Sequence, residues 1–362
     1  MRIGYIGYAN NSGIGNMGLD LIEQFNIDYH FIVNGEDKGT NPSLSKASNK
    51  VISDTWLPDT NELIEFLKQI DIIITIETTY HPDLFKLCKE YNVRSIMIPM
   101  WEWFEWGKYS GADMYICTSR QTYEYLIETV IVEDRVSGDS IVHIPWAIDT
   151  DKFKFRLRGE KPNVMFLHNA GFGGLNCRKG TIEVVSAFNM IKNKDLILIL
   201  NSQRPLEFFP QDIQQIIKTN IQISFNDEDV KDNAALYDVG DVYLYPARYD
   251  GQALVAQEAL ACGLPTFVTD APPMNEFGTD EFFKLPIERE VPIRIHNHSI
   301  DMNLCHAGTL AKRIDECFDL DLKYISNIGR KLIEEKYSWN ALRDKYVKAI
   351  YGTQKEERTT DS

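Results

Sequence analysis

Short apolar segments rich in Ile, Val and Leu alternate with helical stretches along this chain, and that alternation limits the fold more than any other feature. Continuous β-branched runs are typical of strands buried on both faces, and helices between such runs indicate a parallel sheet. The first half is therefore expected to be an α/β domain. We predict strands at Arg2–Tyr8, Tyr29–Val33, Asp71–Ile76, Ser95–Pro99, Ala112–Thr118 and Ile141–Ile144, and helices at Gly13–Phe25, Asn61–Gln69 and Pro82–Tyr91.

The same pattern starts again after a polar segment that contains Gly and Pro, Arg156–Pro162. With 362 residues, the chain is also longer than one hydrophobic core usually supports. We predict two doubly wound, Rossmann-like domains, 1–155 and 156–338, whose ligands bind beyond the carboxyl ends of the strands in an interdomain cleft. In the second half the predicted strands are Asn163–Leu167, Leu196–Leu200, Ile221–Phe225, Val242–Tyr245 and Thr266–Thr269, and the helices Gly180–Met190, Pro210–Thr219 and Ala253–Cys262.

Charge and cysteine content exclude several classes of protein. The formal net charge of −15 disfavours a surface that binds DNA, RNA or anionic lipid throughout, although a local basic cleft stays open. The six cysteines are scattered without a Cys-x-x-Cys pair, which is typical of thiols in a reducing compartment. The chain begins directly with a predicted strand, and no apolar run approaches the roughly 20 residues that cross a bilayer. We expect a soluble, cytoplasmic protein without stable membrane insertion, and its oligomeric state stays open.

A glycine-rich loop, Asn10–Gly18, follows the first predicted strand and contains the pattern GxGxxG. Glycine lets the backbone approach a ligand, and the helix that follows directs free amides at a phosphate, so Gly13 and Gly15 are candidate phosphate-binding residues. Glu36 and Asp37 follow the second strand, where a dinucleotide-binding protein has its ribose-binding acid. This pattern alone is weak. It permits an NAD-type oxidoreductase as one alternative and a plain tight turn as another.

The segment Tyr245–Pro265 carries the strongest signal. A strand ends at a proline, a loop presents Asp250 and a glycine, and a helix begins that carries a second acid, Glu258, eight positions after the first. The helix ends at a Gly followed by a Pro, which is a normal helix stop. Asp250 can accept hydrogen bonds from sugar hydroxyls and Glu258 from a ribose. The amides predicted to face a diphosphate or sugar oxygens are those of Gly251, Gln252 and Ala253.

This segment resembles the donor-binding signature of the family-four retaining glycosyltransferases (glycosyl transferases group 1): an acid, seven residues, a Glu, then Ala-Leu/Met-Ala-Cys-Gly-x-Pro. Here the first acid is Asp250 in place of the usual Glu. Other landmarks follow in the family's order. Pro145–Phe153 is similar to the interdomain segment Pro-Asn-Gly-Val-Asp-x-x-x-Phe, and Arg178-Lys179-Gly180 to the diphosphate-binding Lys-Gly. Tyr337-Ser338-Trp339 is similar to the Phe-Ser-Trp before the last helix.

The resemblance implies the GT-B fold, two Rossmann-like domains that face an interdomain cleft. It also implies that the final helix, 339–354, crosses back to the first domain, and the polar residues 355–362 are expected to form a flexible tail. The sequence departs from the family where Gly-Arg is usual after the first strand of the second domain. His168-Asn169 stand there instead, followed by a longer glycine-rich loop. Arg178, Lys179 or the loop amides are expected to supply the missing positive charge.

The family's catalytic region after the fourth strand corresponds here to Pro99–Trp106. Glu102 is the candidate polar group beside the acceptor. The aromatics Trp101, Trp103, Phe104 and Trp106 form either a stacking wall for an acceptor or ordinary core packing. His81 is a weaker candidate. Asp149-Thr150-Asp151 has the form of a DxD metal motif, but its place in the interdomain segment argues against a metal site.

The resemblance implies transfer of a sugar from a UDP- or GDP-sugar to an acceptor hydroxyl with retention of configuration. Lys179, Arg178 and the helix-start amides would stabilise the leaving diphosphate, so no metal and no cofactor are expected. Asp250 and Glu102 are the predicted catalytic residues. The acceptor stays open among a glycan, a lipid-linked sugar, a protein, a small molecule and a hydroxymethylated DNA base. A non-catalytic module that binds nucleotide sugars or glycans is the second alternative.

Overall fold

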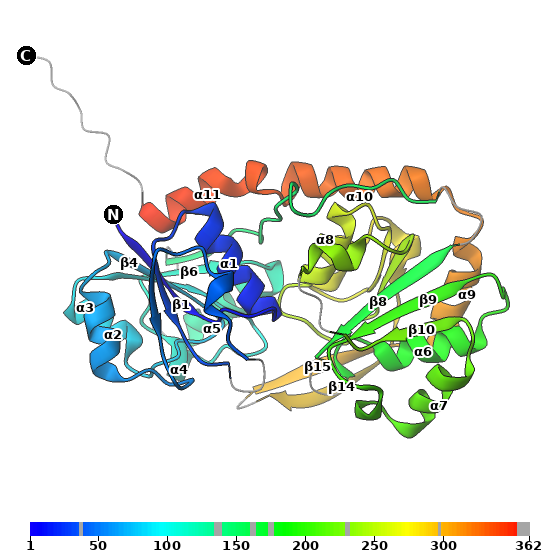
Figure 1. The fold of residues 1–362 in the computed structure, drawn as a ribbon, viewed down its shortest axis with the longest axis horizontal. Helices are drawn as coiled ribbons and strands as arrows, with labels where there is room; N and C mark the ends of the chain where they lie inside the picture. The colour runs from blue at the N-terminus through cyan, green and yellow to red at the C-terminus, as the bar shows by residue number, and fades with distance from the viewer. Residues whose placement is uncertain are drawn as a thin grey trace, which may run out of the picture. The chain divides into compact units, whose positions relative to one another are not determined.

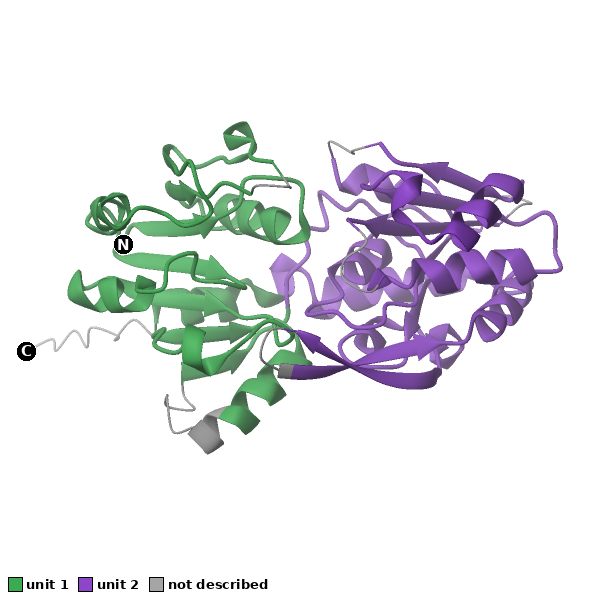
Figure 2. Ribbon diagram, turned by 90° about the horizontal axis from the view of Figure 1, so that it is seen from below, with its two compact units in different colours: residues 1–145, 342–362 green, residues 146–341 purple. Residues whose placement is uncertain are grey.

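A computed structural model of the chain describes residues 1–35, 39–133, 140–159, 164–172, 177–228, 232–295 and 298–352. The chain divides into two compact units, 1–145 with 342–362 and 146–341 (Figures 1 and 2). Each unit is built around a parallel sheet with helices between successive strands. Two α/β domains of the Rossmann type, predicted from the alternation of apolar runs, are therefore confirmed.

Unit 1 contains a seven-stranded parallel sheet in the order β3-β2-β1-β4-β5-β6-β7. Its central strands β1 and β4 have no exposed residue, because helices cover both faces. The edge strand β3 was not predicted, since its residues are mostly exposed and carry no continuous apolar run. The elements are β1 (Ile3–Gly7), α1 (Gly13–Gln24), β2 (Tyr29–Ile32), β3 (Asn49–Ile52), α2 (Thr60–Leu67), β4 (Ile72–Ile76), α3 (Leu84–Glu90), β5 (Arg94–Ile98), α4 (Trp106–Tyr109), β6 (Met114–Cys117), α5 (Arg120–Glu133) and β7 (Ile141–His143).

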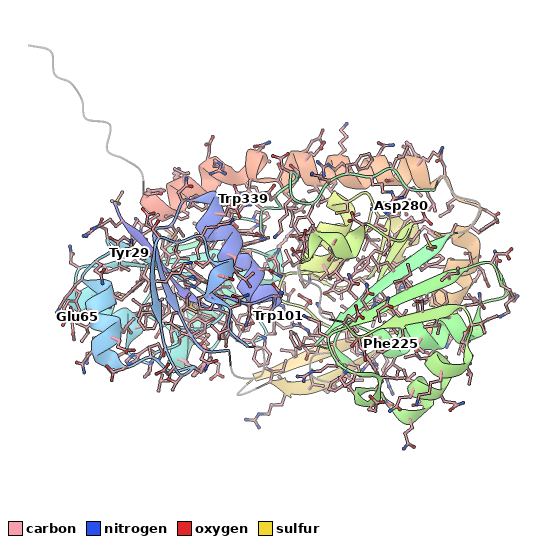
Figure 3. All side chains as sticks on the ribbon, viewed as in Figure 1. Tyr29, Glu65, Trp101, Phe225, Asp280 and Trp339 are labelled. Atoms are coloured by element: carbon pink, nitrogen blue, oxygen red, sulfur yellow. The ribbon has the colours of Figure 1, made fainter. Side chains whose placement is uncertain are left out.

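Unit 2 contains a six-stranded parallel sheet in the order β10-β9-β8-β11-β12-β13. Helices α6 and α7 cover one face and α8 the other (Figure 1). Phe225 of β10 packs against the core beneath α6 and α7 (Figure 3). The elements are β8 (Met165–Gly171), α6 (Thr181–Met190), β9 (Ile197–Ser202), α7 (Gln211–Thr219), β10 (Ile223–Asn226), the 3-10 helix η6 (Ala234–Tyr237), β11 (Val242–Tyr245), α8 (Leu254–Ala261), β12 (Thr266–Thr269), β13 (Lys284–Leu285), β14 (Ile287–Ile295), β15 (His298–Cys305), α9 (Ala307–Cys317) and α10 (Leu322–Lys336).

Strands β14 and β15 form a separate antiparallel hairpin for which the sequence analysis made no prediction. Charged and apolar residues mix along β14, so the segment shows neither a buried run nor a clean alternation. The hairpin joins the rest of unit 2 at its base, where the backbone amide of Asn303 donates to the carbonyl oxygen of Arg248 (2.7 Å). The start of the strand predicted at Asn163 lies outside the described residues, as does the predicted tail 355–362.

The division between the units falls after Pro145, whereas the sequence predicts a boundary at residue 155. The intervening residues belong to unit 2 because their polar groups are satisfied there. The guanidinium of Arg330 in α10 donates to the carbonyl oxygens of Thr150 (3.3 Å) and Phe153 (2.8 Å), and also to that of Ala261 (2.8 Å). A positive charge with three carbonyl partners fixes this segment more firmly than its polar composition suggests.

Two motifs that are far apart in the sequence meet in unit 2. The amide of Ile148 donates to the carbonyl oxygen of Tyr337 (2.7 Å), and the amide of Trp339 donates to Ile148 (3.2 Å). The rings of Trp146 and Trp339 pack edge to face with centroids 6.1 Å apart. Helix α11 (Trp339–Tyr351) starts at this junction, at the labelled Trp339 in Figure 3.

From Leu342 onward helix α11 belongs to unit 1. Arg343 donates to the carbonyl oxygen of Gln24 at the end of α1 (2.8 Å), and the Tyr346 hydroxyl donates to that of Pro145 (3.1 Å). The guanidinium of Arg94 donates to the carbonyl oxygen of Ala349 (2.9 Å). The chain thus completes the core of unit 1 with its last described helix. Among the described helices, none is long and apolar enough to cross a membrane.

The glycines of the GxGxxG loop serve packing and capping in this structure. A Cβ on Gly18 would lie 2.2 Å from the hydroxyl oxygen of the buried Tyr5, so only glycine leaves room for that ring. A Cβ on Gly15 would lie 2.3 Å from the carbonyl oxygen of Asn10. Ser12 caps α1 by accepting a hydrogen bond from the Gly15 amide (3.1 Å). Gly13 has open space around its Cβ position.

We expect Gly18→Ala to destabilise the protein by about 1–3 kcal/mol, because the added methyl group overpacks a core that cannot move the Tyr5 ring aside. Gly13→Ala is the matched control, with the same chemical change at a position without neighbours. Its expected effect on the melting temperature is zero or slightly positive. Calorimetry of both variants checks this, and an equal loss of stability in both would contradict the packing argument.

Candidate functional site

Two loops of unit 2 meet where the strand order of its sheet changes direction. Strands β8 and β11 are parallel neighbours, and the chain leaves β8 toward β9 on one side and leaves β11 toward β12 on the other. Ligands of open parallel sheets bind at the carboxyl ends of such a pair of strands. The loop after β8 carries Arg178 and Lys179, and the loop after β11 carries Asp250. These are three of the residues that the sequence predicts to form the site.

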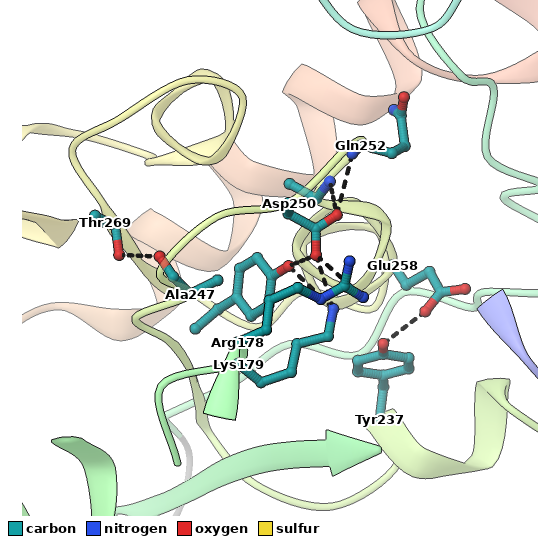
Figure 4. Close-up of polar contacts among 10 residues, drawn as sticks. Arg178, Lys179, Tyr237, Ala247, Asp250, Gln252, Glu258 and Thr269 are labelled. Atoms are coloured by element: carbon teal, nitrogen blue, oxygen red, sulfur yellow. Dashed lines mark hydrogen bonds and ion pairs between the residues drawn. The ribbon is translucent and has the colours of Figure 1, made fainter. Parts of the chain in front are cut away.

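Asp250 and Lys179 form the centre of this arrangement (Figure 4). Lys179 Nζ lies 2.9 Å from Asp250 Oδ2, and Arg178 lies 3.9 Å from the same oxygen. The hydroxyl of Tyr245, the last residue of β11, donates to Oδ2 (2.5 Å). The other oxygen, Oδ1, accepts the backbone amides of Gln252 (3.0 Å) and Ala253 (2.9 Å). Asp250 therefore organises both the cations and its own loop.

The charge of Asp250 is fixed by its surroundings. Burial alone would raise the pKa of this carboxyl, but the charges of Lys179 and Arg178 and the hydrogen bonds from Tyr245 and Lys179 hold the pKa well below its usual value. Asp250 is therefore ionised at every pH near neutrality. In this arrangement it is a negative charge and a hydrogen-bond acceptor.

The amides that the sequence analysis assigned to a diphosphate are partly engaged. Helix α8 begins at Leu254, one residue later than predicted, because Ala253 adopts a left-handed conformation (φ 55°). The amides of Gln252 and Ala253 point at Asp250 Oδ1. The side chain of Gln252 is 3% exposed, and neither of its amide atoms has a hydrogen-bond partner among the described residues. Because an unsatisfied buried amide costs about 1–3 kcal/mol, this carboxamide marks a place where a polar ligand or a water would bind.

Glu258, the second acid of the segment, lies on α8 and is 5% exposed. Its Oε2 accepts a hydrogen bond from the Tyr237 hydroxyl of η6 (2.6 Å), and its Oε1 accepts one from the Asn233 side chain (3.0 Å). The ring of Tyr243 lies between those of Tyr237 and Tyr245, with centroid distances of 5.7 and 6.3 Å. A row of three buried tyrosines thus connects the surroundings of Glu258 with those of Asp250.

The two loops are held together by close packing and by a buried ion pair. A Cβ on Gly180 (φ 73°) would lie 2.0 Å from the carbonyl oxygen of Pro246, so only glycine fits there. The amide of Arg248 donates to the carbonyl oxygen of Arg178 (2.8 Å). The Arg248 guanidinium lies 2.7 Å from Glu183 in the first turn of α6, and both side chains are almost fully buried. These contacts fix the separation of the Lys179 loop and the Asp250 loop.

His168, which departs from the family pattern, also connects the elements that carry the two loops. It is fully buried, and its ring nitrogens bond to the carbonyl oxygen of Leu244 (2.8 Å) and to the Thr181 hydroxyl (2.9 Å). Burial lowers the pKa of His168 to about 4, so the ring is neutral near pH 7. His168 therefore ties β8 to β11 and α6 and carries no charge toward a ligand. The neighbouring Asn169 accepts a hydrogen bond from Asn201 of β9 (2.9 Å).

The remaining predicted residues lie in unit 1. Gly13 is the first residue of α1, and the Gly15 amide is used by Ser12. Glu102, in a turn after β5, is 2% exposed. Phe104 and Trp106 pack edge to face in the core at 4.9 Å, and the indole nitrogen of Trp106 donates to Thr129 (2.7 Å). For these two rings core packing is the observed role; Trp101 is also buried and Trp103 half-buried.

Three further candidates have local structural roles or lie outside the described residues. His81 bonds to the Thr60 hydroxyl (3.1 Å) and accepts the Asp83 amide, which stabilises the approach to α3. Asp149 accepts the amides of Asp151 and Lys152 and so closes a turn. Glu36 and Asp37 are not among the described residues. Within the part of the chain that the structure describes, no group of three or more His, Cys, Asp or Glu side chains is placed to hold a metal ion.

Comparison with known families bears on this site directly. Residues 148–296 match the family described as glycosyl transferases group 1, and this stretch contains Lys179, Asp250 and Glu258. The matched stretch lies within unit 2 and covers less than half of the chain. The protein is a glycosyltransferase, as the signature around Asp250 and Glu258 predicted. No curated protein sequence matches the chain significantly.

Solved structures of glycosyltransferases resemble the whole chain. A glycosyltransferase from Rickettsia africae has a TM-score of 0.69 and 16% identity over 98% of this chain and 100% of its own. HepE of Anabaena, solved in complex with UDP, has a TM-score of 0.70 and 11% identity over 97% of this chain and 100% of its own. The lipopolysaccharide outer core galactosyltransferase WaaB has a TM-score of 0.64 and 14% identity over 98% of this chain and 100% of its own. These likenesses show that this glycosyltransferase has the GT-B fold.

Sequence reasoning did not find Tyr237, Tyr245 or the Arg248–Glu183 pair. Tyr245 lies inside the Tyr245–Pro265 segment, but the sequence indicates for it only the end of a strand. Tyr243 and Tyr245 lie two positions apart on β11 and thus on the same face of the sheet, which was an available signal. Glu183 has no local sign of function, because its partner Arg248 is distant in sequence and reaches it only through the fold.

The charge of Asp250 predicts a specific pH dependence. Its pKa is about 3.9 in the unfolded chain and lower in the folded one, so its ionisation stabilises the fold above that pH and this contribution is lost as pH falls below it. We expect the difference in unfolding free energy between the native protein and Asp250→Asn to shrink below pH 4, by about 1.4 kcal/mol per pH unit. Denaturant titrations from pH 3 to 7 measure it. The exposed Asp195→Asn is the control, and a difference that stays constant down to pH 3 would contradict the assignment.

Proposed function

We propose that this glycosyltransferase transfers a sugar from a UDP- or GDP-sugar to an acceptor hydroxyl, with retention of configuration and without a metal ion. The observation that carries the proposal is the pair of cations, Lys179 and Arg178. They lie where the strand order of the sheet changes direction, in the domain that matches the family. The leaving diphosphate gains negative charge as the bond to the sugar breaks. Fixed positive charges in a partly buried site stabilise that charge and serve where other enzymes use a divalent ion.

The arrangement around Asp250 suggests how a donor is received. A carboxylate has about four acceptor positions, and Asp250 already accepts bonds from Lys179, Tyr245 and two amides. A diphosphate that attracts Lys179 frees one position on Oδ2 for a hydroxyl of the donor's sugar. Lys179 thereby exchanges the carboxylate of Asp250 for a phosphate of the donor. Asp250 exchanges the ammonium group of Lys179 for a hydroxyl of the donor's sugar. The buried carboxamide of Gln252 supplies a further donor and acceptor in the same loop.

Glu258 is assigned to the ribose of the nucleotide, since it lies on α8, directly after the Asp250 loop, and its carboxylate accepts hydrogen bonds. UDP is the first nucleotide to test, because HepE is solved with UDP and with UDP-glucose. The acceptor is a hydroxyl-bearing molecule whose class remains the open choice stated above, and Glu102 is its proposed polar neighbour. All six cysteines are free thiols and five are buried, which supports a cytoplasmic location.

A panel of UDP, GDP and NAD in thermal shift tests the donor class. We expect UDP or GDP, and not NAD, to raise the melting temperature, because a ligand at 100 times its Kd adds about 2.7 kcal/mol of stability. Stabilisation by NAD alone would favour the oxidoreductase alternative. Incubation with UDP- and GDP-sugars is expected to release free nucleotide, detected by mass spectrometry, equally with and without EDTA.

The catalytic part of the proposal predicts that Lys179→Ala lowers the rate of nucleotide release by about 100-fold or more, as is usual when one stabilising group is removed. Glu258→Ala is expected to weaken donor binding. Lys218→Ala, an exposed lysine at the end of α7, is the matched control and should retain the native rate. Native turnover in both Lys179→Ala and Glu258→Ala would show that the donor binds elsewhere.

A further inference from the structure

Each acid of the donor signature accepts a hydrogen bond from the hydroxyl of a buried tyrosine. Tyr245 donates to Asp250 Oδ2 (2.5 Å), and Tyr237 donates to Glu258 Oε2 (2.6 Å; Figure 4). Both tyrosines have almost no exposed surface. Neither has a role in the function proposed above. The same arrangement therefore occurs twice, at two carboxylates that are eight residues apart in the sequence.

The two tyrosines belong to the scaffold rather than to the ligand-facing loop. Tyr245 ends β11, which is buried along its whole length, and Tyr237 ends η6. Their rings pack on either side of the Tyr243 ring. A phenol in such a row has little rotamer freedom, so its oxygen is a fixed point. Asp250 lies in a loop and Glu258 in α8, and the hydroxyls tie the first to strand β11 and the second to η6.

The hydroxyls keep this role over a wide range of pH. Burial, and then the negative charge of the neighbouring carboxylate, raises the pKa of Tyr237 and of Tyr245 far above 10. Both phenols are therefore always protonated and always donate. Hydrogen bonds to a charged acceptor are the stronger kind, and low-dielectric surroundings strengthen them further. Tyr245 also accepts a hydrogen bond from Lys179 (3.2 Å). Its bond to Asp250 uses the phenol proton, so this bond does not depend on Lys179.

We propose that Tyr237 and Tyr245 are positioning residues, each of which fixes the orientation of one signature carboxylate: Tyr237 that of Glu258, and Tyr245 that of Asp250. The inference rests on the function proposed above and adds that the two tyrosines act on different steps. Tyr237 acts on binding of the nucleoside through Glu258. Tyr245 acts on the transfer step through Asp250.

Single substitutions to phenylalanine remove one oxygen each and keep the packing. We expect Tyr237→Phe to raise the Kd for the nucleotide, and the KM for the donor, by about 10-fold or more with kcat little changed, as for loss of a hydrogen bond to a charged group. Tyr245→Phe is expected to lower kcat by a similar factor, with the nucleotide Kd within about twofold of native. Tyr243→Phe is the matched control, because its hydroxyl has no hydrogen bond to either acid in the described chain.

The experiment uses the full chain, with calorimetric titration of UDP or GDP, whichever raises the melting temperature of the native protein. Rates of nucleotide release from the matching nucleotide sugar and the melting temperature of each variant complete the set. A double-mutant cycle then asks whether Tyr237 acts through Glu258. Added to Glu258→Ala, Tyr237→Phe should cause no further loss of affinity, and Tyr245→Phe added to Asp250→Ala no further loss of kcat.

The outcomes separate the inference from the function on which it rests. If the native protein binds neither nucleotide, the proposed function fails, and the inference with it. If the native protein binds and turns over but Tyr237→Phe and Tyr245→Phe behave like Tyr243→Phe, the inference alone fails. Parallel losses of Kd, kcat and melting temperature in both variants would also overturn it, since they would show a structural role without division between the two acids.

Discussion

The buried contact between Lys179 and Asp250 is the interaction on which the site depends. Burying either charge alone would be costly, and a buried pair is stable only when hydrogen bonds satisfy its remaining valences. Asp250 meets that condition through Tyr245 and through the amides of Gln252 and Ala253. The cation is thus held at the carboxyl end of β8 by a carboxylate from the neighbouring strand's loop. In the proposed function a diphosphate replaces the carboxylate as the partner of Lys179, whose charge is already in place.

Several other features of unit 2 fix the distance between the Lys179 loop and the Asp250 loop. Gly180 removes the Cβ that would strike Pro246, and Arg248 joins the loops through its backbone and through Glu183. His168 stands in the position where the family has a glycine before its arginine, and it serves as a neutral bridge between β8, β11 and α6. The residue in the place of the family's arginine is Asn169, whose side chain accepts a hydrogen bond from Asn201 of β9.

The glycine-rich loop of unit 1 shows how one pattern can have different physical causes. GxGxxG was interpreted as a phosphate cradle, because glycine permits close approach of a ligand. In the structure the third glycine, Gly18, permits close approach of Tyr5, and the second, Gly15, that of Asn10. Whether a ligand also contacts Gly13 stays a prediction. A glycine in such a pattern indicates that other atoms lie close to the backbone. The sequence does not show whether those atoms belong to a ligand or to the protein itself.

The sequence by itself determined most strands of both sheets, the restart of the pattern between them and the candidate acids Asp250 and Glu258, because these depend on local periodicity and on a contiguous motif. It missed the β14–β15 hairpin, whose mixed pattern has no single period, and the edge strand β3, whose residues are exposed. Only the tertiary structure decided that Tyr237 and Tyr245 support the two acids and that Arg248 pairs with Glu183. The physical reason is that hydrogen bonds and ion pairs join atoms by their distance in space, and that distance is set by strand order and packing rather than by position along the chain.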